Sequence, residues 1–124
     1  MGNRLKWSEL ETMKHKVVTL IGSTKKEWQN RYRQVERELT LAGYVVISVG
    51  LFKTDVPNIE TYRELLESIH FQKIDMADVV VLIDKKAEGE HTSLEKEHCK
   101  EIGKPMVTFT TSEDCRKEIE AFNG

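Results

Sequence analysis

The chain has 124 residues, of which 39% are hydrophobic and 32% charged, and its formal net charge is -2. This length corresponds to one domain with a single core, and the balanced charge excludes a strongly basic nucleic-acid-binding protein. The longest apolar run, Val79 to Ile83, is far shorter than the roughly 20 residues that cross a bilayer, and residues 1–15 contain no apolar signal segment. Cys99 and Cys115 follow no metal or redox spacing, so two reduced thiols are favoured over a disulfide. We expect one cytoplasmic domain over residues 1–124, with residues 1–15 as an N-terminal extension and with neither nucleic acid nor a membrane as partner.

Short β-branched and apolar runs, typical of buried strands, alternate with segments whose apolar residues recur at a helical period. In chain order, we expect a strand at 16–21, a helix at 26–41, a strand at 44–49, a helix at 59–76, a strand at 79–83, a helix at 92–102, a strand at 105–109 and a helix at 112–122. Residues 5–13 are considered for a further short helix. Gly43 and Gly103 are expected to end helices, and Ser112 is expected to cap the last one.

Strands that alternate with helices predict a parallel sheet with helices on both faces and right-handed crossovers. Ligands of such sheets bind at the carboxyl ends of the strands. We therefore expect the site in the loops that hold residues 22–24, 50–58 and 84–92.

The segment Gly22-Ser23-Thr24 follows the first predicted strand and leads into a helix. Backbone N–H groups and two hydroxyls at such a position favour phosphate or another anion, which Lys25 could reach. The segment lacks both the glycine-rich dinucleotide pattern and the P-loop ending, so neither a Rossmann cofactor site nor an NTPase is supported. An ordinary tight turn is the equal alternative.

Thr92 and Glu95 have the spacing of a capping box, in which Glu95 would only fix the start of a helix. The same position has a functional interpretation, because the positive end of the helix dipole stabilises a carboxylate in the first turn. An ionised carboxylate in a cleft at the strand ends could attack an anomeric carbon. From the local pattern alone, the capping box is favoured.

The histidines have several interpretations. His91, Glu95 and His98 share one helical face at a spacing found in carboxylate metal sites, but further ligands are lacking and solvated histidines are the default. We expect no metal and no other cofactor. His70, near the end of the helix at 59–76, is either a solvated residue or a general acid, because imidazole titrates near neutral pH.

Four segments carry a further pattern: 17–24 (VVTLIGST), 39–50 (LTLAGYVVISVG), 70–78 (HFQKIDMAD) and 89–105 (GEHTSLEKEHCKEIGKP). In this order and spacing they resemble the nucleoside 2-deoxyribosyltransferase-like superfamily, and most of all its small, often phage- or prophage-encoded members. The resemblance covers about residues 16–110. It implies a flavodoxin-like α/β fold, a three-layer sandwich with a four- or five-stranded parallel sheet.

Enzymes of this superfamily cleave the N-glycosidic bond of deoxynucleosides or nucleoside 5′-monophosphates. A glutamate attacks C1′ and forms a glycosyl-enzyme intermediate, from which water or another base takes the sugar. The resemblance implies that Glu95 is this glutamate. Where the enzymes usually carry an aspartate that assists protonation of the leaving base, this chain has His70, and where they usually carry a tyrosine on the first strand, it has Thr19.

In members that accept nucleotides, the 5′-phosphate lies against the first glycine-serine turn and the start of the nucleophile's helix. Together with the strand-end loops, this implies a substrate-binding site for a small nucleoside or nucleotide. Its expected residues are Gly22, Ser23, Thr24, Gly50, Gly89, His91, Thr92 and Ser93. Members commonly form dimers or larger oligomers, so we expect a homo-oligomer with the helices at 59–76 and 92–102 in the contact.

Two functions follow as hypotheses. The first is a hydrolase or deoxyribosyltransferase with Glu95 as nucleophile and His70 as proton donor. The alternative is a non-catalytic nucleotide- or phosphosugar-binding module on the same fold, which the missing tyrosine and aspartate favour. A third and weaker hypothesis is a metal-dependent protein that uses His91, Glu95 and His98.

Overall fold

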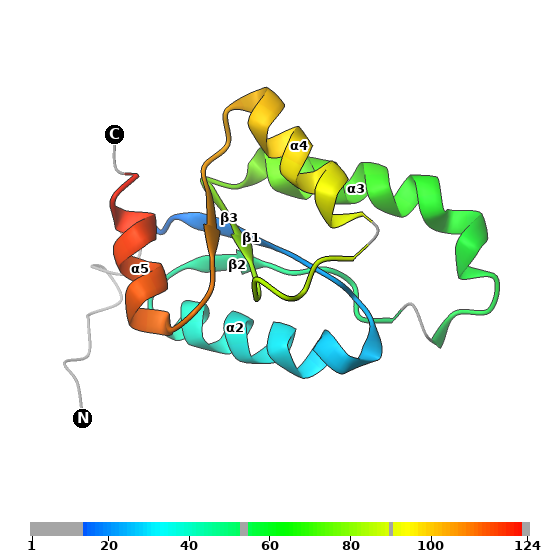
Figure 1. Ribbon diagram of the computed structural model, residues 1–124, viewed down its shortest axis with the longest axis horizontal. Coiled ribbons are helices and arrows are strands. Elements are labelled where there is room, and N and C mark those ends of the chain that lie inside the picture. The colour runs from blue at the N-terminus through cyan, green and yellow to red at the C-terminus, as the bar shows by residue number, and fades with distance from the viewer. Residues whose placement is uncertain (1–13, 53–54, 90, 123–124) are drawn as a thin grey trace.

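The computed structural model describes residues 14–52, 55–89 and 91–122 (Figure 1). The strands are β1 (Val17–Ile21), β2 (Val45–Ile47), β3 (Val79–Leu82) and β4 (Met106–Thr108). The α-helices are α2 (Gln29–Leu41), α3 (Arg63–Met76), α4 (Thr92–Ile102) and α5 (Ser112–Glu120), and short 3-10 helices, η1 (Lys26–Trp28) and η3 (Ile59–Tyr62), precede α2 and α3. The helix considered at 5–13 lies outside the described residues.

The strands form one parallel sheet in the order β2-β1-β3-β4. The chain moves from β1 to one neighbour, β2, and then back across β1 to β3. Because crossovers are right-handed, this reversal requires α2 on one face of the sheet and α3 and α4 on the other, as Figure 1 shows. The fold is α/β with four strands among the described residues, consistent with the expected flavodoxin-like three-layer sandwich.

Both faces of the sheet are covered by helices, which explains why the strands are apolar on both sides. Alternate residues of a strand point to opposite faces. In β1, Val18 and Leu20 join a buried cluster with α2 and α5, whereas Ile21 packs in a second cluster with α3 and α4. The cluster beside α2 and α5 is the larger one and contains Tyr32 and Phe109, two of the largest fully buried side chains.

Two of the expected helices begin differently from the sequence prediction. The helix predicted at 26–41 starts with η1, because the Trp28 N–H bonds to the Lys25 carbonyl at 2.9 Å, three residues back. The helix predicted at 59–76 starts with η3, where the Thr61 N–H bonds to the Asn58 carbonyl at 3.0 Å. Each helical segment is present as expected, with a tighter first turn.

The cap of α5 is Thr111, so the prediction of Ser112 is wrong. Thr111 has the extended backbone that an N-cap residue needs, and its Oγ1 accepts a hydrogen bond from the Asp114 N–H at 3.2 Å. Ser112 is already the first helical residue. Gly43 and Gly103 follow α2 and α4 with φ of +100° and +69°, the left-handed conformations with which helices end.

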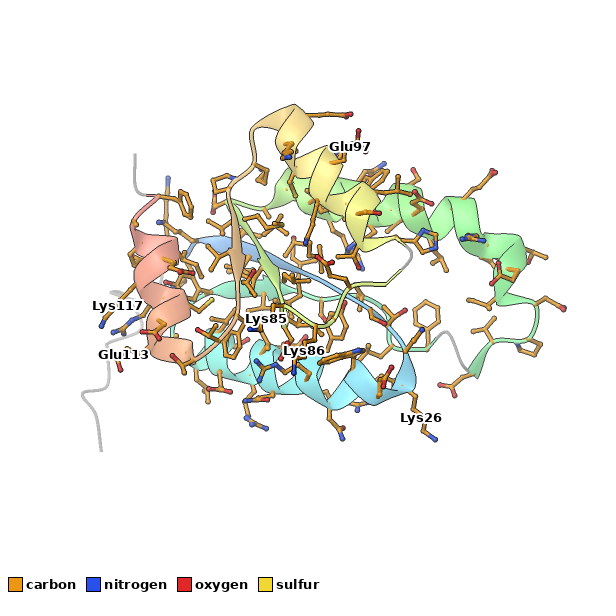
Figure 2. The ribbon with its side chains drawn as sticks, in the orientation of Figure 1. Lys26, Lys85, Lys86, Glu97, Glu113 and Lys117 are labelled. Carbon is orange, nitrogen blue, oxygen red and sulfur yellow. The ribbon has the colours of Figure 1, made fainter. Side chains whose placement is uncertain are left out.

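The cysteines agree with the sequence expectation of two reduced thiols, and charged side chains lie on the outside of the helices (Figure 2). Lys26, Glu97 and Lys117 extend away from the ribbon on the outer sides of their helices (Figure 2). Cys99 and Cys115 are both free and buried, in different clusters on opposite faces of the sheet. Within residues 14–52, 55–89 and 91–122, no helix has the length and apolar character needed to cross a membrane.

Candidate functional site

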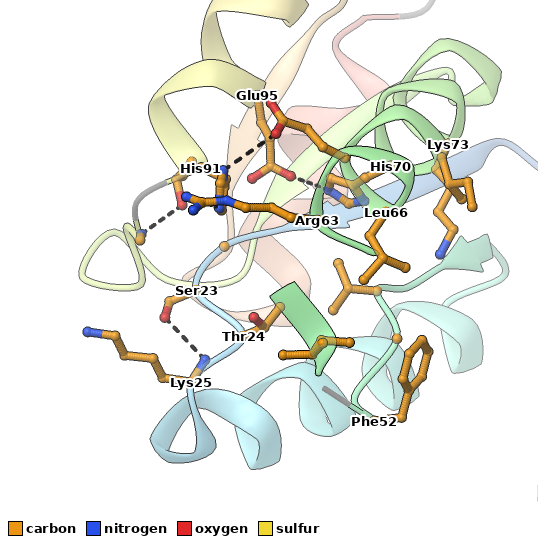
Figure 3. A pocket seen from close by; sticks show the side chains of 18 of the residues that line it. Ser23, Thr24, Lys25, Phe52, Arg63, Leu66, His70, Lys73, His91 and Glu95 are labelled. Carbon is orange, nitrogen blue, oxygen red and sulfur yellow. Dashed lines mark hydrogen bonds and ion pairs between the residues drawn. The ribbon is translucent and has the colours of Figure 1, made fainter. Parts of the chain in front are cut away.

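A cavity of about 500 Å³ lies at the carboxyl ends of the strands. Its walls come from the segments after β1, β2 and β3 and from η3, α3 and α4 (Figure 3). The chain leaves β1 and β3, which are neighbours, for helices on opposite faces of the sheet. A crevice at such a switch point is where open parallel sheets bind ligands, so the cavity lies where the sequence predicted a site.

The loops after β1 and β3 form one wall of this cavity because their backbones meet. The Ser23 N–H donates to the Ala87 carbonyl at 2.6 Å. Gly22 permits this approach: its φ is +141°, and a Cβ at this position would lie 2.9 Å from Ile83 Cγ1 and 3.2 Å from the Ala87 oxygen. Gly89 lies against Ser23, which a Cβ at position 89 would touch at 3.4 Å.

Glu95 and His70 form a buried pair on the cavity. Glu95 lies in the first turn of α4 with 6% of its surface exposed, and its Oε2 pairs with Nε2 of His70, whose side chain is 13% exposed on α3. Figure 3 shows the two side chains pointing toward each other. The contact is an ion pair, and Nε2 of His70 has no hydrogen-bond partner among the described residues.

The capping box expected at the start of α4 is not formed. Thr92 is the first helical residue, His91 is the N-cap, and the helix has no side-chain cap. The Thr92 hydroxyl instead accepts from the Gly89 N–H at 2.8 Å. Since Thr92 has already entered the helix, it cannot serve as an N-cap, and the carboxylate of Glu95 is turned to His70.

A second and more exposed pair joins the same two helices. Nη2 of Arg63, the first residue of α3, lies 3.2 Å from Nε2 of His91. A guanidinium can only donate, so Nε2 of His91 accepts and the proton of this imidazole resides on Nδ1, which lies 3.8 Å from Oε2 of Glu67. Figure 3 shows the Arg63 side chain reaching across the cavity toward His91.

The opposite wall of the cavity is apolar. Its side chains follow β2 or belong to η3 and α3, and they are Val49, Phe52, Ile59, Leu66 and Ile69. The Phe52 ring packs over Gly50, where a Cβ would overlap the ring. Gly50 therefore contributes to the site by giving room to an aromatic side chain.

The structure brings nearly all of the predicted site residues to this cavity. Those that line it are Gly22, Ser23, Thr24, Gly50, His70, Gly89, His91, Thr92 and Glu95. Ser93, which was also expected to bind the substrate, is exposed on α4 and is not among the described lining residues.

The turn after β1 offers fewer donors for an anion than the sequence suggests. The Ser23 N–H is taken by Ala87, and the Lys25 N–H donates to Ser23 Oγ at 3.3 Å. The helix that follows begins with η1, which continues directly into α2. Its dipole favours an anion, but these two N–H groups are already bonded within the turn.

Two further hydroxyls near the site have structural partners. Thr19, to which the sequence resemblance assigns the position of the superfamily's tyrosine, is fully buried in β1 and donates from Oγ1 to the Lys73 carbonyl at 2.6 Å. The Tyr32 hydroxyl of α2 donates to the Gly22 carbonyl at 2.6 Å and so supports the cavity wall. Burial, and to a lesser extent the charge of Glu95, raises the pKa of Tyr32 above its usual value.

The three residues considered for a metal do not come together. Nε2 of His98 donates to Oδ1 of Asp75 at 2.7 Å, and Glu95 is paired with His70. Within the described part of the chain, no group of three or more His, Cys, Asp and Glu side chains is arranged to hold a metal ion.

Four charged residues of the cavity were missed by the sequence analysis: Glu60 on η3, and Arg63, Glu67 and Lys73 on α3. The Lys73 ammonium donates to the Ser48 carbonyl at 3.1 Å. Arg63, Glu67 and His70 follow one another at spacings of four and three, which places them on one face of a helix. This spacing around His70 was the available signal.

Comparison with known proteins finds no family model that matches the chain and no curated protein with significant similarity to it. The chemistry of the site is therefore inferred from its own geometry and from the resemblance described above. That geometry combines a buried carboxylate-imidazole pair, one polar wall and one apolar wall.

Proposed function

We propose that this protein cleaves the N-glycosidic bond of deoxynucleosides or deoxynucleoside 5′-monophosphates, as a hydrolase or a deoxyribosyltransferase. The observation that carries the proposal is the pair formed by Glu95 and His70 on the cavity at the strand ends. Displacement at an anomeric carbon needs a carboxylate nucleophile and a proton donor for the leaving group. The sequence resemblance supports the same role for Glu95.

The two unlike walls of the cavity support a nucleoside as substrate. A planar base fits the apolar wall that contains Phe52, because aromatic rings pack favourably with one another. The sugar then faces the polar wall around Ser23 and Thr92, with C1′ beside Glu95. A pocket with an apolar body and a few convergent polar groups is the usual form of a small-molecule site.

The proposed reaction has two displacements. In the first, a carboxylate oxygen of Glu95 bonds to C1′ while the bond between C1′ and the base breaks, and the electron pair of that bond leaves with the base. The base takes the Nε2 proton of cationic His70. In the second, neutral His70 removes a proton from water, and the water oxygen displaces Glu95 from C1′ and yields the free sugar. A second base in place of water gives transfer.

The alternative function is a non-catalytic nucleotide- or phosphosugar-binding module, and one observation favours it. The hydroxyl of Thr19 is used inside the fold, by the Lys73 carbonyl, so β1 supplies no hydroxyl to the cavity at that position. In the catalytic proposal, His70 has to act without a hydroxyl from β1. A product assay separates the two functions.

We also propose that the protein acts in the cytoplasm as a homo-oligomer, a dimer or larger, through α3 and α4. Reduced thiols such as Cys99 and Cys115 suit that compartment. The two helices expose large apolar side chains: Leu65, Ile69, Met76, Leu94 and Ile102. Exposed apolar patches of this kind mark interaction surfaces. Ile69 also lines the cavity, so a partner there would border the site, and a monomer in sedimentation equilibrium would contradict the proposal.

The proposed function is tested by incubating the purified protein with deoxynucleosides and deoxynucleoside 5′-monophosphates, with and without an acceptor base, and separating the bases by chromatography. We expect release or exchange of a base, and a loss of at least about 10³-fold in Glu95→Gln, because the nucleophile is removed. Glu97→Gln is the matched control, since Glu97 points outward from the same helix (Figure 2). Its rate should equal that of the unaltered protein.

Thermal unfolding of both variants shows whether each one is folded. Equal product formation by folded Glu95→Gln and the unaltered protein would contradict the catalytic role of Glu95. No product from any substrate, combined with a rise of the melting temperature on addition of a monophosphate, would support the binding module instead.

A further inference from the structure

Two pairs of side chains connect α3 and α4 across the cavity, and only the inner pair is used by the proposed chemistry. The inner pair is His70 with Glu95, and the outer pair is Arg63 with His91. His91 precedes Glu95 by four residues, so it lies about one turn, roughly 6 Å, from Glu95 along the axis of α4. On α3, Arg63 precedes His70 by seven residues, which is about two turns or roughly 10 Å. The separation on the α4 side matches the reach from C1′ across a furanose to its 5′ substituent.

The outer pair has the chemistry of a phosphate receptor. The guanidinium of Arg63 is a planar, permanently charged fork whose N–H groups fit two oxygens of one phosphate. Its hydrogen bond to Nε2 of His91 and its ion pair with Glu60, whose Oε2 lies 3.7 Å from Nη1, hold it over the cavity (Figure 3), and all three residues line that cavity. An arriving phosphate can replace the imidazole nitrogen as the acceptor without any movement of α3.

The competing place for a phosphate is the turn after β1, and it is less well equipped. Its Ser23 and Lys25 N–H groups already have acceptors, in Ala87 and in the Ser23 hydroxyl. The cation of that turn, Lys25, is exposed, as Arg63 is, but the ammonium of a lysine offers a point charge without the paired geometry of a guanidinium. Between the two places, the geometry favours Arg63.

We propose that Arg63 is the residue that makes the site select nucleoside 5′-monophosphates over nucleosides, by binding the phosphate beside His91. This inference rests on the proposed function for the identity of the substrate. It goes further by naming the substrate class and the residue that sets the preference. The specificity of the site then resides in a residue of α3 that touches neither the base nor C1′.

The test measures binding, in a Glu95→Gln background that prevents turnover. Isothermal titration with the four common deoxynucleoside 5′-monophosphates and the four matching deoxynucleosides gives a preference ratio for each base. We expect Arg63→Gln to weaken binding of the monophosphate by about 10- to 100-fold, the usual worth of a charged hydrogen bond, and to leave the nucleoside unchanged. Arg63→Lys should recover part of the loss, because it restores the charge without the fork.

Two control variants locate the effect. Arg33→Gln removes the same chemical group from the exposed face of α2, where Arg33 bonds only to Asn30 among the contacts described, and the preference ratio should stay within about twofold. Lys25→Gln tests the competing place. A larger loss in Lys25→Gln than in Arg63→Gln, an equal loss for both ligands, or no measurable binding of any monophosphate would overturn the proposal.

The outcome of the binding test does not depend on the outcome of the product assay. If the product assay fails but the ratio still depends on Arg63, the protein is a monophosphate-binding module and the role of Arg63 stands. If product forms from nucleosides and monophosphates with equal efficiency, and Arg63→Gln changes neither, then the catalytic proposal survives and this one is overturned.

Discussion

The two faces of the sheet differ in the residues that are buried against them. Beside α2 and α5 the core is continuous and contains Tyr32, Phe109 and Ile119, all fully buried. Beside α3 and α4 the apolar cluster is smaller, and near the strand ends Glu95 and His70 occupy the space between the helices. A buried carboxylate costs free energy unless it is paired, so the second face gives up stability in order to hold the site.

The difference shows how a chain of this size combines a stable fold with a charged interior. One face supplies most of the apolar burial, and the other accommodates buried polar groups, which cost less free energy when they are hydrogen-bonded. Thr19 illustrates this on the second face, where its buried hydroxyl is satisfied by a carbonyl of α3. The comparison predicts that substitutions on the two faces have separable consequences.

The largest effect is expected on the face of α2 and α5. Phe109 is 2% exposed, and its ring lies 4.9 Å from the Arg31 guanidinium. Phe109→Ala removes this ring and leaves a cavity, so we expect the free energy of unfolding to fall by about 3–5 kcal/mol in urea titrations. Ligand binding by the fraction that is still folded should be unchanged. A loss below about 1 kcal/mol would contradict the assignment of stability to this face.

A smaller effect is expected on the face of α3 and α4. Thr19→Val keeps the size of the side chain but removes the donor to the Lys73 carbonyl at 2.6 Å. We expect the free energy of unfolding to fall by about 1 kcal/mol, the net worth of a hydrogen bond. Urea titration at neutral pH measures it. An increase in stability would mean that apolar packing at this position outweighs the hydrogen bond.

A further effect, confined to alkaline pH, distinguishes the faces by their thiols. Burial raises the pKa of Cys99, beside α4, from about 9 to about 11, with a further contribution from the charge of Glu95, and burial raises that of Cys115, on α5, to about 12. Both thiols therefore hold their protons longer in the folded than in the unfolded chain. The free energy of unfolding is unaffected below pH 9 and falls as the pH rises from 9 through the folded pKa values.

The slope cannot exceed about 1.4 kcal/mol per pH unit for each thiol. We expect the free energy of unfolding to fall less steeply with pH in Cys99→Ala, up to about pH 11, and in Cys115→Ala, up to about pH 12. Urea titrations under reducing conditions between pH 8 and 12 measure both. Tyr32 and Tyr44 also have raised pKa values, but they contribute equally to all variants and cancel in the difference. If the free energy of unfolding falls equally steeply with pH in the unaltered protein and in both variants, the assignment of the decline to these thiols is contradicted.

The fold could be predicted because its signals are local. The strands are short apolar runs, such as the one that begins at Val79, and alternating strands and helices leave few arrangements for a parallel sheet. The starts of α2 and α3 could not be predicted, because a tight first turn depends on how the preceding loop packs. The cap of α5 was misplaced by one residue for a related reason: Thr111 and Ser112 are equally good caps in the sequence, and only the backbone separates them.

The site could be predicted in part. The strand-end loops and the two residues Glu95 and His70 were found, but their contact depends on how α3 packs against α4. The capping box at Thr92 was a valid local pattern that a tertiary contact overrode. Arg63 shares a helical face with His70, but its partner His91 is 28 residues away on another helix, and a spacing within one helix does not identify such a partner.

The wall made by Gly22 and Ser23 has a consequence for redesign of the protein. Its position is set by a hydrogen bond to a main-chain oxygen, that of Ala87, and by the same oxygen and Ile83 standing where a Cβ of residue 22 would be. A carbonyl oxygen is present whatever residue occupies position 87. Residues whose side chains face the cavity can therefore be exchanged to accept other substrates without displacing the scaffold that holds them, provided that position 22 stays glycine.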